Sequence, residues 1–322
     1  MDYLASVNGS ESAIRLGCFF GVLVLVAVAE QFMPRRHRQR GTTVRWINNF
    51  GLVLVNTLAL RLLLPITAVG VAIFAEIRSL GLLNQFAVSP WLAVPLAVIA
   101  LDLVIYLQHV VFHAFPVLWR LHMVHHADQD FDVSTGLRFH TIEILLSMGI
   151  KMGAIVLLGA PALAVLVFEV LLNATSMFNH ANVRLPLGLD RVLRLFVVTP
   201  DMHRVHHSVI ARETNSNFGF NLPWWDFLFG TYRSQPAEGH DGMTIGLSQF
   251  RERGVQHLHR MLALPFVGQV GDYLVNGDRH DDATQDPPRS NGVVASGTDA
   301  KRTEPGQGAN GKRQGAPLEP VR

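Results

Sequence analysis

The residues of this chain that could do chemistry are histidines gathered in three short motifs. The first motif reads HxxxH, and the second and third both read HxxHH. Imidazole is the commonest metal ligand near neutral pH, because its unperturbed pKa of roughly 6.5 leaves it mostly uncharged there. One histidine alone would be a core or hydrogen-bonded residue, but three spaced motifs favour a metal centre, and two metals would share about four imidazoles each. The motifs are His109 and His113; His122, His125 and His126; and His203, His206 and His207.

The spacing within the motifs favours one shared site. His109 and His113 are four residues apart, so they lie one above the other on one helix face. The other two motifs each begin with a cofacial i, i+3 pair, and adjacent histidines diverge enough to serve different metals. Asp102 lies on nearly the same face as His109, and a carboxylate in an apolar span is usually functional or paired. It could orient His109 or His113, or it could pair with Arg61.

The composition predicts that these motifs lie at a membrane. Of 322 residues, 49% are hydrophobic and only 16% are charged. The single cysteine, Cys18, excludes an intrachain disulfide and a cysteine-ligated zinc or iron–sulfur site. A net charge of +2 gives no case for nucleic acid binding. A helical span needs roughly 20 residues, and the candidate segments are 14–33, 50–75, 91–112 and a hairpin over 142–178 that breaks near 159–161, with arms that are borderline in length.

Basic residues between the first two segments predict the orientation. Five arginines lie between positions 35 and 45, and the positive-inside rule assigns such a loop to the cytoplasm. We interpret them as a topology signal and prefer this to a ligand-binding role. The amino terminus then lies outside, and an even number of crossings between the second and third motifs keeps all three on the cytoplasmic side. The predicted fold is an all-α, polytopic membrane protein with four or five transmembrane helices and a cytoplasmic histidine-rich dimetal cap.

The stretch from about 101 to 232 resembles the fatty acid hydroxylase/sterol desaturase superfamily, and most closely its bacterial sterol desaturase-type members. The resemblance includes all three histidine motifs in order. The matching pieces are Asp102-x-x-x-Tyr106-x-x-His109-x-x-x-His113, Trp119-Arg120-Leu121-His122-x-x-His125-His126, Arg138-Phe139-His140-x-x-Glu143, His180-Ala181-Asn182, Thr199-Pro200-Asp201-Met202-His203-x-x-His206-His207, Asn217-Phe218-Gly219 and Trp225-Asp226-x-x-Phe229-Gly230-Thr231-Tyr232.

The resemblance implies a non-haem dimetal enzyme that activates oxygen and attacks unactivated C–H bonds of lipids. Such bonds lie beyond side-chain acid–base catalysis, so a redox metal must carry the step. Nitrogen ligands suit iron, although zinc binds them more tightly than ferrous iron does. We therefore expect two Fe ions, with Zn possible on purification, and O2 as co-substrate. The expected reaction is hydroxylation or desaturation of a sterol-like, fatty acyl or related membrane lipid. Alternatives are oxidative cleavage of an ether lipid and a non-catalytic metal- or lipid-binding membrane protein.

The resemblance also bears on two histidines outside the motifs. His180 resembles a histidine that completes the metal shell in relatives, which implies nine histidine ligands. Some fatty acid hydroxylases carry another histidine four residues earlier, where this chain has Ser176. His140 is the candidate replacement, and its alternative is an interfacial hydrogen-bonding role beside Arg138 and Glu143.

Four further charged residues have two interpretations each. Asp128 could orient second-motif imidazoles or only cap and solvate a loop. Asp201 begins the third-motif element, where it could cap a helix or support a ligand. Lys151 and Glu169 lie inside the hairpin, and we expect them to face the bundle interior or to pair with each other.

The chain divides by composition into four segments. We predict an N-terminal transmembrane region over 1–97, a fatty acid hydroxylase-type catalytic domain over 98–235, a cytoplasmic segment over 236–280 and a disordered tail over 281–322, which has little apolar surface to bury. No haem, flavin or phosphate-binding motif is found, so electrons must come from a separate donor, for which ferredoxin or a small cytochrome is a hypothesis. The predicted location is a bacterial inner membrane, with the histidine site and the C-terminus cytoplasmic.

Overall fold

Helices make up the regular structure of the protein. The computed structural model describes residues 2–275. Within this range the elements run from α1 to α13 with three short 3-10 helices, and β pairing is confined to two isolated bridges. The prediction of an all-α fold is confirmed. The predicted disordered tail, 281–322, lies outside the described residues, as do the last positions of the predicted 236–280 segment.

Five segments are long and apolar enough to cross a membrane, by length and composition. They agree with the predicted four or five spans. Their lipid-facing character shows in exposed side chains such as Leu62, which is 81% exposed, since large exposed apolar surfaces mark contact with lipid or a partner. The long helices are α1 (Asp2–Phe32), α2 (Thr42–Leu63), α4 (Pro90–Ala114), α6 (Thr141–Leu158) and α7 (Ala162–Asn179).

The predicted second span, 50–75, was wrong as a single helix. Helix α2 begins at Thr42 and ends at Leu63, and a separate helix, α3 (Ala68–Ile77), follows. Pro65 explains the break, because proline lacks the N–H of a helical hydrogen bond and disfavours helical backbone at the preceding residue. Thr67 then starts α3, since its hydroxyl accepts a hydrogen bond from Gly70 N at 3.0 Å. The second candidate span therefore holds α2, α3 and η1 (Leu82–Gln85).

The hairpin of α6 and α7 matches its predicted break. The turn lies between Leu158 and Ala162, and Gly159 caps α6 with φ +65°, a conformation that suits glycine. Lys151 Nζ donates to Glu169 Oε1 at 2.5 Å, which confirms the predicted pairing. Arg15 also lies 2.8 Å from the other oxygen of Glu169, so α1, α6 and α7 share one buried ion cluster.

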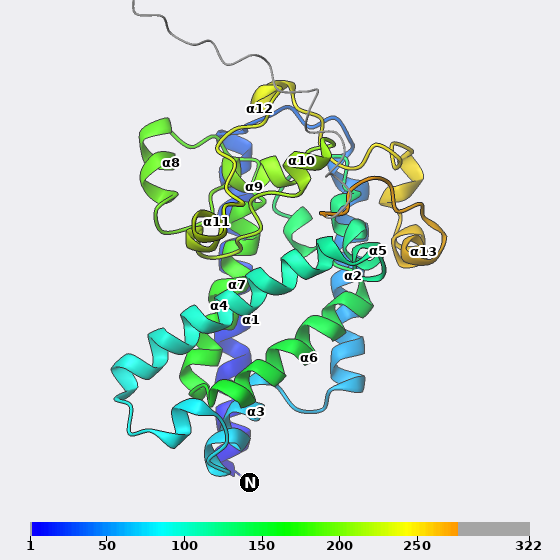
Figure 1. Ribbon diagram of the computed structural model, residues 1–322. Coiled ribbons are helices and arrows are strands. Elements are labelled where there is room, and N and C mark those ends of the chain that lie inside the picture. Colours follow the sequence, from blue (N-terminus) through cyan, green and yellow to red (C-terminus); the bar gives the residue numbers. More distant parts are fainter. Residues whose placement is uncertain (1, 276–322) are drawn as a thin grey trace, which may run out of the picture. The chain divides into compact units, whose positions relative to one another are not determined.

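The long helices position a cap of short helices at one end of the bundle. Figure 1 shows the start of α1 at the opposite end from α9, α10 and α12. Helix α4 packs against α5, α6 and α7, and α1 packs along α7. One hydrophobic core joins the cap to the bundle, where α2, α5 and α13 pack together around Trp119 and Met261. The cap elements are α5 (Pro116–His126), η2 (Thr135–Leu137), α8 (Leu187–Leu193), α9 (Pro200–His206), α10 (Ala211–Thr214), α11 (Trp224–Phe229), α12 (Gly239–Gly242), η3 (Arg253–Gln256) and α13 (Leu258–Val267).

Candidate metal centre

Four helix ends deliver the histidines to one place. The first motif lies in the last two turns of α4, and the second motif ends α5. His180 is the C-cap of α7, and His207 is the C-cap of α9. Helix C-termini carry partial negative charge and favour nearby cations. Prolines at the first positions of α5 and α9, Pro116 and Pro200, fix where these two short helices begin.

The nine predicted histidines form two buried groups. Within each group the candidate ligand atoms all lie within 4.8 Å of one another. The structure thus brings together all three motifs and His180, although they come from four separate parts of the chain. The first group is His109, His113, His122, His126 and His206, and the second is His125, His180, His203 and His207.

The outer nitrogen of most of these histidines is held by an acceptor. The Nδ1 atoms of His109 and His206 each lie 2.8 Å from a backbone carbonyl oxygen, and His180 Nδ1 lies 2.7 Å from the oxygen of Ser176. A carbonyl can only accept, so each of these Nδ1 atoms carries the hydrogen and leaves a lone pair on Nε2. Such contacts fix the tautomer and ring orientation that a metal ligand needs.

The Nε2 nitrogens that point into the two groups lie close together with their lone pairs facing each other, an arrangement that a bound cation would stabilise. His109 Nε2 and His122 Nε2 are 3.0 Å apart, and His125 Nε2 and His180 Nε2 are 3.1 Å apart. In both pairs the Nδ1 atoms face acceptors, so lone pairs meet lone pairs. Several further inner nitrogens, including His206 Nε2, are buried without a hydrogen-bond partner. Buried polar atoms without partners cost free energy, and metal ions in each group would satisfy them.

Burial keeps the cap histidines neutral. Burial first, and neighbouring imidazoles second, lower the pKa of His126, His206 and His207 well below the ordinary value. Burial likewise lowers the pKa of His180 to about 3, although the Ser176 carbonyl opposes the shift. These imidazoles are therefore uncharged at neutral pH and ready to bind a metal without first losing a proton.

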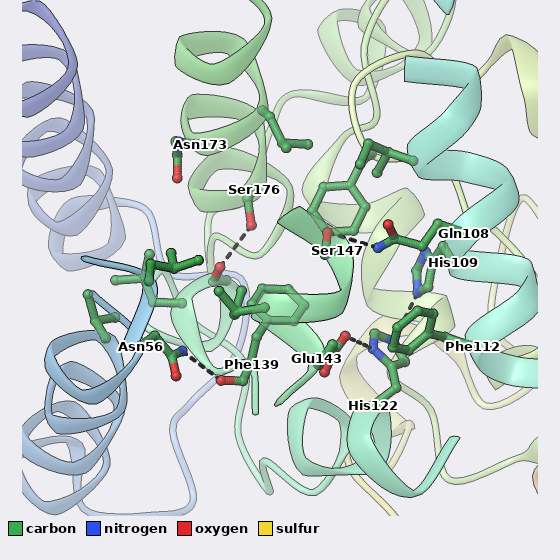
Figure 2. Close-up of a pocket in the computed structure, with 18 of the residues that line it drawn as sticks. Asn56, Gln108, His109, Phe112, His122, Phe139, Glu143, Ser147, Asn173 and Ser176 are labelled. Atoms are coloured by element: carbon green, nitrogen blue, oxygen red, sulfur yellow. Dashed lines mark hydrogen bonds and ion pairs between the residues drawn. The ribbon is translucent and has the colours of Figure 1, made fainter. Parts of the chain in front are cut away.

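Glu143 is a residue of the site that the sequence interpretation missed as a partner. Its Oε1 lies 2.6 Å from His122 Nδ1, and both side chains are buried (Figure 2). Carboxylate–histidine–metal arrangements orient the imidazole and raise its basicity. The motif Arg138-Phe139-His140-x-x-Glu143 includes this carboxylate, but the sequence interpretation considered Glu143 only as a neighbour of His140 and not as a partner of a metal-binding histidine.

His140, predicted as a possible ligand, is not near either group. Its Nδ1 accepts from Ile142 N at 3.2 Å, so it caps α6, and its Nε2 lies 3.3 Å from the oxygen of Leu262. These contacts fit the hydrogen-bonding alternative. The reason is positional, since a residue that begins α6 at the edge of the cap faces α13 and not the histidine cluster.

Asp102 makes no direct contact with His109 or His113, and it does not pair with Arg61. Its oxygens accept from Asn221 Nδ2 at 2.8 Å, from Leu222 N at 3.2 Å and from Trp225 Nε1 at 2.8 Å. The carboxylate therefore holds the loop over residues 215–222, which the sequence does not show to be adjacent to α4.

This 215–222 loop is itself a main support of the first histidine group. Asn215 Oδ1, Ser216 O and Phe218 O face His113, His206 and His109 respectively. Asp226 fixes the loop, because its two oxygens accept from Phe218 N at 2.8 Å and Gly219 N at 2.9 Å. Burial raises the pKa of Asp226 to about 6, against these hydrogen bonds.

Asp128 and Asp201 pair with arginines and touch no metal-group imidazole. Arg45 Nε and Nη2 each lie 2.8 Å from an oxygen of Asp128, and Arg45 Nη1 lies 2.7 Å from Asp132. Burial raises the pKa of Asp128, but Arg45 outweighs burial and holds this pKa at about 2. Asp201 pairs with Arg35 and Arg204, and Thr199, not Asp201, caps α9. Asp201 is thus not the predicted helix cap, and its direct partners are arginines.

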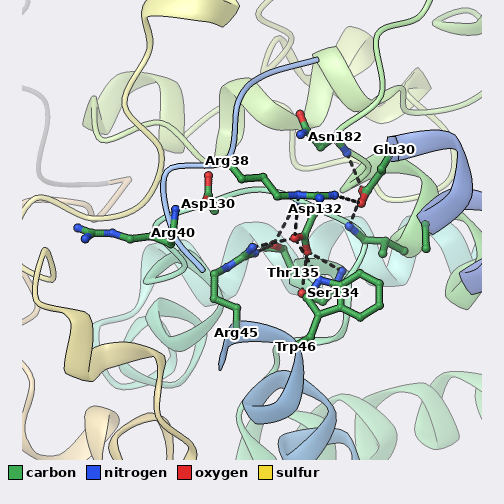
Figure 3. A network of polar contacts seen from close by, with 12 residues as sticks. Glu30, Arg38, Arg40, Arg45, Trp46, Asp130, Asp132, Ser134, Thr135 and Asn182 are labelled. Atoms are coloured by element: carbon green, nitrogen blue, oxygen red, sulfur yellow. Dashed lines mark hydrogen bonds and ion pairs between the residues drawn. The ribbon is translucent and has the colours of Figure 1, made fainter. Parts of the chain in front are cut away.

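The basic loop between α1 and α2 has a structural role beyond the predicted topology signal. Figure 3 shows Arg38 between Glu30 and Asp132, beside Arg45. Arg38 Nη2 lies 2.6 Å from Glu30 Oε2. The other oxygen of the same carboxylate, Glu30 Oε1, accepts from Asn182 N at 2.8 Å. The loop therefore ties α1 and α2 to the chain segments that follow the second motif and His180.

A cavity of about 250 Å³ opens beside the first histidine group. We call it the metal-side chamber. Its wall comes from α1, α2, α4, α5, η2, α6 and α7, and it includes His109, His122 and Glu143 (Figure 2). If a small molecule were bound with its reacting group inside this chamber, that group would lie against the first histidine group. The rest of the bound molecule would lie among the apolar helices.

Comparisons with known proteins agree with this architecture. Residues 94–231 match the family model described as Fatty acid hydroxylase. The chain is 34% identical over 144 residues to an ornithine lipid hydroxylase of Rhizobium tropici, a match that covers 44% of this chain and 42% of that protein. It is 29% identical over 174 residues to the alkylglycerol monooxygenase of Homo sapiens, covering 53% of this chain and 37% of that protein. No solved structure matches significantly.

The chain spans less than half the length of these curated relatives. The matched segment nevertheless contains every one of the nine clustered histidines and the carboxylate at Glu143. Residues 94–231 are therefore similar to the fatty acid hydroxylase family, and the helical fold and the histidine motifs agree with this similarity.

Proposed function

We propose that this protein catalyses the iron- and O2-dependent hydroxylation of a membrane lipid at the histidine centre. The observation that carries the proposal is the convergence of two groups of imidazoles, with lone pairs facing each other, beside a chamber among the membrane-spanning helices. Side chains alone cannot break an aliphatic C–H bond, and two iron ions bound by these groups would supply the oxygen chemistry.

The proposed ligands are the nine clustered histidines, five for one metal and four for the other. The chain's own residues hold the Nδ1 atoms of six of these imidazoles against acceptors, and the burial of all nine keeps the centre away from bulk water. We propose 98–235 as the catalytic domain, as the sequence predicts. We propose that the cap and the C-terminus face the cytoplasm of a bacterial cell, and that a separate ferredoxin or small cytochrome donates electrons.

The relatives favour hydroxylation over desaturation. The matched proteins are named as a lipid hydroxylase and as monooxygenases. The second name supports one alternative substrate, an ether lipid, in which hydroxylation at the carbon beside the ether oxygen leads to cleavage. A non-catalytic metal-binding protein would keep a filled and redox-silent metal shell, and this difference is testable.

Oxygen-18 labelling tests the function. Cells that express the wild type, His125→Ala or the matched control His259→Ala would be grown with iron under oxygen-18 gas, and their lipids compared by mass spectrometry. His259 is an exposed histidine outside both groups. We expect one labelled oxygen in a lipid with the wild type and the control, and none with His125→Ala. A lipid that loses two hydrogens without label would indicate a desaturase. Identical lipids in all three cultures, with folded and iron-loaded protein, would contradict the proposal.

A further inference from the structure

The wall of the metal-side chamber carries two acceptors that lack partners. Among the described residues that line it, Gln108 Oε1 and Glu143 Oε2 are buried side-chain acceptors without a hydrogen-bond partner. Asn56, an amide on α2 that also lines the chamber, has hydrogen-bond partners for both of its polar atoms. Its nitrogen donates to Phe139 O at 2.8 Å, and its oxygen accepts from Thr141 Oγ1 at 2.6 Å. A buried acceptor without a partner costs free energy unless a bound molecule supplies the donor.

Gln108 is held so that its oxygen stays available. Its Nε2 donates to Ser147 Oγ at 3.0 Å, which links α4 to α6. Figure 2 shows this amide and Glu143 on the chamber side that carries His109 and His122. Because Gln108 directly precedes His109 on α4, a group bound to its oxygen would lie near the first histidine group.

A second cavity, of about 320 Å³, shares part of its wall with the chamber. We call it the apolar cavity. Gln108 and Phe112 line both cavities. The remaining wall of the apolar cavity consists of aliphatic side chains from α4 and α6, together with Leu118 of α5. On α4, Leu107 and Val111 face the apolar cavity, while Ile105 and His109 face the chamber, as expected for adjacent faces of one helix.

We propose that the two cavities together bind an amphiphilic lipid whose hydroxyl or amide N–H donates to Gln108 Oε1. The hydrocarbon chain of this lipid lies in the apolar cavity, and the carbon beside the donor group lies at the first histidine group. The inference rests on the proposed function and specifies its substrate class. The site selects a lipid oxidised next to a polar group over one oxidised in the middle of a plain hydrocarbon chain.

The probes for a binding test are 1-O-hexadecylglycerol, which has two hydroxyl donors, and its 2,3-di-O-methyl ether, which keeps the oxygens and lacks the donors. Full-length, zinc-loaded protein in nanodiscs would bind the tritiated glycerol ether in a scintillation-proximity assay, and each probe would compete with it. Zinc is redox-silent, so the assay measures affinity without turnover. We expect the wild type to prefer the hydroxylated probe by about tenfold or more, the usual effect of losing a partner for a buried acceptor.

Two variants of Gln108 test whether this side chain causes the preference for the hydroxylated probe. Gln108→Leu removes the acceptor, and we expect the preference to fall by about tenfold. The matched variant Gln108→Glu keeps a side-chain oxygen, and it retains the preference. Any penalty for the bulk of the methyl groups, or for unequal partition into the membrane, remains in both variants and so cancels in the comparison. Zinc content measured in each sample shows that the histidine groups are intact.

Equal affinity of the wild type for both probes overturns this proposal whether or not any variant folds. A preference that persists unchanged in Gln108→Leu overturns it as well. The proposed function fails separately: an absent oxygen-18 signal with an intact, Gln108-dependent preference rejects the oxidation and supports the binding site.

Discussion

At the scale of single residues, the site depends on what holds the outer nitrogen of each imidazole. His122 is held by a carboxylate, His109 by the carbonyl of Phe218 and His113 by the amide oxygen of Asn215. A carboxylate is the strongest acceptor of the three, and its charge makes the imidazole a better ligand. Glu143 is therefore the supporting side chain whose loss should be felt most.

Replacement of Glu143 should weaken metal binding. We expect Glu143→Ala to lower the metal affinity by about 10- to 100-fold, the usual effect of removing such a partner. Glu143→Gln keeps a neutral acceptor for His122 Nδ1 and should have a smaller effect. Metal titration of the apoprotein measures both, with the exposed Glu252→Gln as control. Unchanged affinity in Glu143→Ala would contradict the role of this carboxylate.

The structure separates the two histidines outside the motifs. His180 lies in the four-histidine group, whereas His140 caps α6 and contacts Leu262. We expect His180→Ala to lose one of two bound metals and His140→Ala to keep both, although it should lose about 1 kcal/mol of stability with the cap. Elemental analysis of the purified variants decides this. Full metal content in His180→Ala would remove His180 from the ligand set.

At the scale of elements, buried ion pairs join the spans to the cap. Arg45 of α2 is 1% exposed, and the Asp128 and Asp132 side chains that it contacts are fully buried. Charges buried in this way need their partners, because water cannot replace them. These ion pairs therefore join α2 to the chain after the second motif.

Loss of the Arg45 side-chain charge should destabilise the protein strongly. Arg45→Met removes the paired guanidinium from the buried Asp128 and leaves Asp132 with Arg38 alone, and we expect a loss of about 3–5 kcal/mol in the free energy of unfolding. Arg45→Lys should also be destabilising, because an ammonium cannot reproduce the paired contacts with Asp128. Denaturant unfolding in detergent measures the loss, and the exposed Arg253→Met serves as the matched control. A loss as small as that of the control would refute this account.

At the scale of the whole described chain, all nine clustered histidines lie at one end of the bundle. Figure 1 shows the chain turns before and after α3 at the end that carries the start of α1, away from α9. The four arginines between α1 and α2, and Arg45 in the first turn of α2, lie at the cap end. The positive-inside rule then predicts a cytoplasmic cap.

Cysteine labelling tests this orientation. In a Cys18→Ala background, a membrane-impermeant maleimide should label Leu82→Cys in intact spheroplasts. Leu82 is exposed and begins η1, and the chain turn after α3 lies at the end away from the cap (Figure 1). Arg253→Cys, in η3 of the cap, should be labelled only after permeabilisation. The reverse pattern would place the histidine centre outside the cell.

The sequence alone determined the features that depend on neighbouring positions in the chain. Helical spacing showed that His109 and His113 share a face, and hydropathy showed the long apolar helices, since both signals repeat within a few residues. The helix break at Pro65 was also visible locally, although we read across it. The ligand set came from the family resemblance as much as from spacing, because nothing local connects His180 to the motifs.

Only the tertiary structure decided which groups support the ligands. His109 and Phe218 are 109 residues apart, and Arg45 and Asp128 are 83 apart. Asp102, Asp128 and Asp201 stand close to the motifs in sequence, so contact with an imidazole was one of two expectations for each, but each side chain binds a different partner. Contacts across such separations are set by how whole helices pack, and no periodicity in one segment encodes which distant carbonyl or guanidinium it will meet.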